Sequence, residues 1–143
     1  MKLKSSTGSF ELSIKGYGVK GTSWRDRNSL LCELSTEWQK EIYTQSAPLQ
    51  TWEIKRLING LKLLWNRAIP HLTVSFSEPG LNVEASSLPN ELYLLQIQLD
   101  HTLMPDWHPY PEFPVLLDIT LTRYQLREAI RDLVSQLALF PER

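Results

Sequence analysis

Three side chains that often ligate metals lie close together in one proline-rich stretch. His101, Asp106 and His108 fall within eight residues of one another, and imidazole and carboxylate groups are common zinc ligands. Zinc sites usually space their histidines more tightly, or place two of them one helical turn apart. The four prolines between 105 and 114 forbid regular structure here. We therefore expect ordinary surface histidines and no bound metal.

A glycine-rich segment is the second candidate site. Gly16, Gly18 and Gly21 spell G-x-G-x-x-G after an alternating, strand-like pattern. A dinucleotide site also needs a helix that begins at once, so that its N-terminus meets the pyrophosphate. The residues from 22 to 28 show no apolar period of 3.6. We interpret the segment as a connection between strands.

The single cysteine does not resemble a nucleophile. Cys32 shares strand parity with Leu30 and Leu34, which places it on an apolar face, where a thiol is inert. The sequence contains no P-loop, H-E-x-x-H, G-x-S-x-G or EF-hand motif. We expect no catalytic residues and no cofactor. An enzyme whose carboxylates meet only in the folded protein remains a further possibility.

The segment from Ala68 to Thr122 carries charge of one sign. It contains no Lys and no Arg, although the net charge of the whole chain is only -1. It holds seven carboxylates: Glu78, Glu84, Glu91, Asp100, Asp106, Glu112 and Asp118. Gathered on one surface, they would attract a basic protein and speed its encounter. Scattered around the sheet, or neutralised by Lys and Arg from the helices, they would have neither effect.

Length and composition predict one cytoplasmic domain, residues 1–143. A chain of 143 residues has the usual size of a single domain. Its start lacks the apolar run of a signal peptide, and no stretch approaches the ~18 apolar residues of a membrane span. Lys and Arg are scattered, which argues against nucleic-acid binding. The oligomeric state is left open.

Hydrophobic periodicity predicts an α+β domain. Alternation in five segments predicts strands, at 9–15, 28–45, 71–86 (a hairpin), 91–100 and 113–121. An apolar period of 3.6 predicts helices near 51–66 and 123–138. Thr122 and Gln125 form a capping-box pattern before the second helix. We expect an antiparallel sheet of five or six strands with two helices packed on one face.

Two of these segments allow finer predictions. The 28–45 segment exceeds the usual strand length, so we expect a bulge or bend near Lys40. In the hairpin, Pro79 and Gly80 stand where a type II turn wants them. That turn would place Glu78 opposite Leu81 and Phe76 opposite Val83, and a wider loop in the same register is an alternative.

Read as a whole, the chain resembles the WapI-like immunity proteins of bacterial contact-dependent toxin systems. The resemblance is a spaced pattern over most of the chain. It comprises Ser29-Leu-Leu-Cys-Glu-Leu, the helix from Glu53 to Trp65, Val74-Ser-Phe76-Ser-Glu78-Pro79-Gly80-Leu81, Leu95-Gln-Ile-Gln-Leu99, Pro105-Asp106-Trp107 and the end Leu139-Phe140-Pro141-Glu-Arg143. The segment from Gly16 to Gly21 departs from the family pattern. The resemblance implies a small α+β protein that is not an enzyme and that binds a toxin domain.

The acidic segment is where we expect the partner to bind. Its residues include aromatic side chains on a backbone stiffened by prolines, with carboxylates around them. The predicted partner-binding residues are Glu78, Asp106, Trp107, His108, Tyr110 and Glu112, and the predicted partner is a basic toxin domain. One alternative is that Trp107 folds inward as a lid on the sheet's end, with no partner at all. Another is that the protein is a cytoplasmic domain that acts as an oligomer subunit or a small-ligand binder.

Overall fold

Eight strands form two antiparallel sheets in the computed structural model, which describes residues 1–6, 8–18, 21–110 and 112–143. The first sheet has the order β1-β2-β3-β4, with strands Lys2–Lys4, Gly8–Tyr17, Ser29–Trp38 and Glu41–Gln50. The second has the order β5-β6-β7-β8, with strands His71–Ser75, Leu81–Leu88, Leu92–Leu99 and Val115–Thr122. In each sheet, every strand pairs with the next one along the chain.

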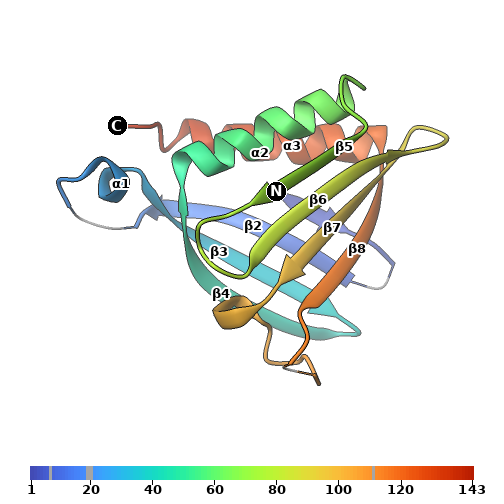
Figure 1. Ribbon diagram of the computed structural model, residues 1–143, viewed down its shortest axis with the longest axis horizontal. Coiled ribbons are helices and arrows are strands. Elements are labelled where there is room, and N and C mark those ends of the chain that lie inside the picture. Colours follow the sequence, from blue (N-terminus) through green and yellow to red (C-terminus); the bar gives the residue numbers. More distant parts are fainter. Residues whose placement is uncertain (7, 19–20, 111) are drawn as a thin grey trace.

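Each sheet is followed by a long helix. These are α2 (Thr51–Trp65) after the first sheet and α3 (Arg123–Ala138) after the second, with a short α1 (Trp24–Arg27) and a 3-10 turn η1 (His101–Leu103) elsewhere. Figure 1 shows α2 and α3 side by side across one end of the two sheets. One hydrophobic core takes side chains from both sheets and from both long helices. Both long helices and the capping box at Thr122 and Gln125 are confirmed.

The prediction of one sheet of five or six strands with two helices is wrong in detail. The segment 28–45 contains parts of two strands, because the chain reverses at Gln39 and Lys40. Both residues have positive φ, 49° and 69°, as a two-residue type I′ hairpin turn requires. The reversal pairs Ile42 with Glu37 and leaves Ile42 exposed, although its parity had predicted the apolar face. Strand β1 is only three residues long, too short to show a pattern.

The hairpin of β5 and β6 is confirmed, but its predicted register is wrong by two residues. Val74 pairs with Val83 and Leu72 with Ala85. A shift of two residues leaves every side chain on the face of the sheet that was predicted for it, because the side-chain period of a strand is two. It also gives a longer loop, in which Gly80 has φ 107° and a Cβ would collide with the carbonyl of Asp100. Only glycine fits that combination.

The Cys32 side chain is fully buried in the core, as predicted. Burial raises the pKa of its thiol to about 12, because the apolar surroundings disfavour the charged thiolate. We expect a thiol reagent such as Ellman's reagent to leave the native protein unmodified at pH 8 and to react with one thiol in urea. Rapid modification without denaturant would contradict the buried position.

A buried carboxylate joins the start of α2 to the loop between β5 and β6. Glu53 accepts hydrogen bonds from the backbone N–H of Gln50, at 3.1 Å, and from the hydroxyl of Ser77, at 2.9 Å. The backbone N–H of Ser77 also donates to it. The carboxylate therefore caps the helix and holds a loop of the other sheet at the same time.

Replacing Glu53 by Ala is expected to lower the free energy of unfolding by about 2 kcal/mol, because buried donors lose their acceptor. Glu53→Gln, which keeps one acceptor oxygen, should lower the free energy of unfolding by a smaller amount. Urea denaturation measures both variants. Equal losses in Ala and Gln variants would show that the charge matters rather than the hydrogen bonds.

Candidate functional site

The proline-rich connection between β7 and β8, residues 100–114, crosses the lower end of the molecule in Figure 1. It is held at two points. The backbone N–H of Asp100 donates to the carbonyl of Gly80 at 2.9 Å, and the side-chain amide of Gln45 on β4 donates to the carbonyl of Leu103 at 2.5 Å. A ring nitrogen of His108 lies 2.9 Å from the carbonyl of Phe113 within the connection itself.

Trp107 is folded inward. Its ring stacks on that of Trp38, the last residue of β3, with centroids 5.5 Å apart and planes at 23°. Its side chain is half-buried and packs against the core. This is the lid position, which was the alternative to an exposed anchor. The stack attaches the connection to the first sheet, so the rest of the connection is presented on a supported base.

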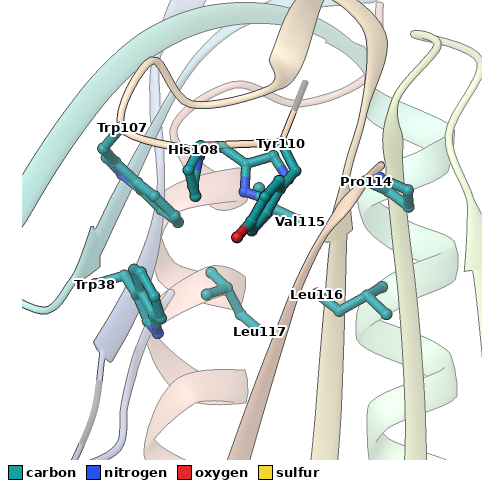
Figure 2. A pocket seen from close by; sticks show the side chains of 9 residues that line it. Trp38, Trp107, His108, Tyr110, Pro114, Val115, Leu116 and Leu117 are labelled. Atoms are coloured by element: carbon teal, nitrogen blue, oxygen red, sulfur yellow. The ribbon is translucent and has the colours of Figure 1, made fainter. Parts of the chain in front are cut away.

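The aromatic series continues from Trp107 toward solvent. His108 meets the ring of Trp107 edge-on with centroids 6.3 Å apart, and Tyr110 meets His108 at the same distance. These rings border an open cavity of about 180 Å³. Its lining comprises Trp38, Trp107, His108, Pro109, Tyr110, Pro114, Val115, Leu116 and Leu117. Figure 2 shows the two tryptophans on one side of the cavity and Tyr110 reaching into it.

Large apolar side chains stay exposed around this cavity. Tyr110, Phe113 and Leu116 expose 60%, 61% and 63% of their surface. A backbone hydrogen bond from Phe113 to Tyr110, 3.0 Å long, closes a turn that holds the first two near each other. Exposed apolar groups gathered beside a cavity are typical of a binding surface.

Five of the six predicted site residues lie in this connection as neighbours in sequence, and three of them, Trp107, His108 and Tyr110, line the cavity. Asp106, Tyr110 and Glu112 are exposed, and Trp107 and His108 are half-buried. Glu78 lies apart from them. It borders another cavity, with Arg25 and Ser29. Because Ser29 and Trp38 are the first and last residues of β3, Glu78 and the aromatic series lie at opposite ends of that strand.

The seven carboxylates of the acidic segment do not form one cluster. Glu84 and Asp118 are exposed on the outer face of the second sheet, in one row with Gln96, whose amide donates to Asp118 at 3.1 Å. Glu91 lies in the turn between β6 and β7, at the far end of the strands from Asp106. The outer face of this sheet is nevertheless free of Lys and Arg, because none occurs in its strands.

The predicted site left out six residues of the cavity lining. These are Trp38, Pro109, Pro114, Val115, Leu116 and Leu117. Leu117 was assigned to the core by its alternation, which is correct, and Leu116 has the outward parity of a strand. No sequence signal could connect Trp38 with Trp107, because 69 positions separate them.

The described residues show no group of three or more His, Cys, Asp or Glu side chains that could hold a metal ion. His101, which the sequence grouped with Asp106 and His108, lies in η1. Among the described helices, none is long and apolar enough to cross a membrane. The residues that line the cavity offer mainly aromatic and apolar contacts.

The chain matches a known protein family. The model of the immunity protein WapI-like family matches residues 2–141, nearly the whole chain. No curated protein and no solved structure matches the chain.

Proposed function

The chain belongs to the immunity protein WapI-like family, and from this premise we propose that it is an immunity protein, a non-catalytic protein that binds a toxin domain and occludes it. The family match supports the class of function. The contact surface is our own assignment from the geometry.

The proposed contact surface, here called the loop surface, comprises Asp106, Trp107, His108, Tyr110, Glu112, Phe113 and Leu116. The observation that carries the assignment is the exposure of Tyr110 and Leu116, which line the cavity, and of Phe113, which precedes the lining residue Pro114. Burying such side chains on binding is favourable, and hot spots of protein interfaces are rich in aromatic residues. Trp107 acts as the support of the surface, and Tyr110 is its exposed anchor.

The loop surface is ordered before a partner binds, and this preorganisation favours tight binding. Prolines restrict the backbone, and the Trp38–Trp107 stack and the His108–Phe113 contact hold it in place. A surface that is already ordered loses little conformational entropy when the partner binds. The carboxylates of Asp106 and Glu112 give it negative charge, and Asp118 on β8 adds to this charge from outside the loop surface. Such charge steers a basic partner.

Co-expression of this chain with a candidate toxin domain tests the proposal. We expect the two to co-purify as a complex and the toxin to lose its activity. If no toxin co-purifies and size-exclusion chromatography shows a dimer of this chain instead, the exposed apolar groups belong to a self-association surface, and the immunity proposal is wrong.

Reversal of one charge tests where the partner docks. Asp106→Lys is expected to slow association about tenfold at low salt, because the steering field weakens, with a smaller effect at high salt. The control is Glu91→Lys, which makes the same charge change at the far end of the strands. Stopped-flow kinetics measures both. Equal slowing in the two variants would indicate general charge attraction without a docking site at the loop surface.

A further inference from the structure

We propose that the cavity between Trp38, Trp107 and Tyr110 receives one cationic side chain, Arg or Lys, of the partner protein. This inference rests on the proposed function, since it names the group that the toxin domain inserts. It is tested on the isolated protein, so the two can fail separately.

The walls of the cavity offer aromatic rings to an occupant. Trp38 and Trp107 are stacked, and His108 and Tyr110 continue the series at right angles. Figure 2 shows Tyr110 reaching into the cavity with its hydroxyl oxygen directed toward Leu117. A cation beside such rings is attracted by their quadrupoles, and the hydroxyl oxygen can accept a hydrogen bond from an ammonium or guanidinium group.

Elsewhere the chain supplies its own cations to aromatic rings. Arg143 lies 3.7 Å from the ring centroid of Tyr17, and Arg123 lies 3.8 Å from that of Trp65. Three further rings are approached in the same way, those of Trp52, Tyr93 and Tyr124. Among the described residues, no Arg or Lys covers Trp38, Trp107 or Tyr110. These rings remain available to a cation from outside.

Charge around the cavity favours the same occupant. Asp118 borders the adjoining cavity, which shares Trp38, Leu116 and Leu117 with the first. No Lys or Arg is found among the described residues that line either cavity. A cationic side chain in the first cavity would therefore have a carboxylate in the adjoining cavity and no like charge among the lining residues of either one. Its methylene stem suits the apolar walls at Val115 and Leu117, and a space of 180 Å³ admits one long side chain.

The probe is n-butylguanidinium, which has the head and stem of an arginine side chain, and the comparison is n-butylurea, its neutral analogue. In ¹⁵N-labelled protein, the indole N–H signals of Trp38 and Trp107 are identified with Trp→Phe variants. We expect millimolar butylguanidinium to shift these two signals saturably, with an affinity about fivefold higher than that of butylurea. The signals of Trp24 and Trp52, whose rings lie outside the cavity, should stay in place.

Two matched variants test whether the carboxylate of Asp118 contributes to binding, or whether any carboxylate on this face of the sheet would have the same effect. Asp118→Asn is expected to weaken butylguanidinium binding about threefold, with butylurea unaffected. Glu84→Gln, which removes a carboxylate from the same row of the sheet two strands away, should change neither. Equal affinity for both probes would overturn the inference in favour of a neutral apolar occupant. Uniform shifts of all five tryptophans, or no saturable shift, would also overturn it.

Discussion

Replacing Tyr110 by Ala is expected to weaken binding of the toxin domain by about 30-fold or more, the effect of losing a ~2 kcal/mol hot spot. Tyr110 exposes 60% of its surface beside the cavity, on a connection held by the Trp38–Trp107 stack. Its loss removes buried contact area in the complex and leaves the support in place. Isothermal titration calorimetry with the purified toxin domain measures the change.

The matched control for this variant is Tyr124→Ala. Tyr124 is a tyrosine of nearly equal exposure, 63%, on α3 and outside the loop surface. We expect it to leave the affinity unchanged. Since both side chains are mostly exposed, neither variant should unfold the protein. If the two variants bind equally well, the toxin docks elsewhere. If Tyr124→Ala is the weaker binder, the contact surface includes α3 and excludes the loop surface.

Replacing Ile130 by Ala is expected to lower the free energy of unfolding by about 2–5 kcal/mol, the usual cost of truncating a buried aliphatic side chain. Ile130 lies in the middle of α3 and exposes only 7% of its surface. The helix packs on α2 and on strands of both sheets. The truncation therefore leaves a void in the hydrophobic core to which Ile130 belongs.

The control on the same helix is Val134→Ala. Val134 exposes 38% of its surface, so its truncation should cost less than about 1 kcal/mol. Urea denaturation should show a lower midpoint for Ile130→Ala with an unchanged slope. A midpoint as high as that of the wild-type protein would mean that this stripe of α3 does not face the core.

The fold explains why the seven carboxylates of the acidic segment, which are close in sequence, do not form one cluster in space. Strands β5 to β8 turn alternate residues to opposite faces, so the carboxylates of the acidic segment separate between the outer face and the connecting loops. In the proposed loop surface, the negative charge would come from Asp106 and Glu112, with Asp118 beyond it on β8, and not from all seven carboxylates. Glu78 in particular lies by a different cavity.

Several features of this protein follow from the sequence because they depend on neighbours along the chain. The helices α2 and α3 follow from an apolar period of 3.6, and the capping box at Thr122 needs only the three residues after it. The alternation in β7 and β8 predicts which side chains enter the core. The buried state of Cys32 follows from the same rule.

Other features were decided by tertiary structure alone. The turn at Gln39 and Lys40 contains none of the usual turn residues Gly, Asn, Asp or Pro, so its positive φ angles have no sequence signal. That turn divides one apparent strand into β3 and β4, which pair with each other and complete the first sheet. It also fixes Trp38 at the end of β3, where Trp107 stacks on it across 69 positions of sequence. Whether Trp107 faced solvent or the core depended on this long-range contact, which no local period encodes.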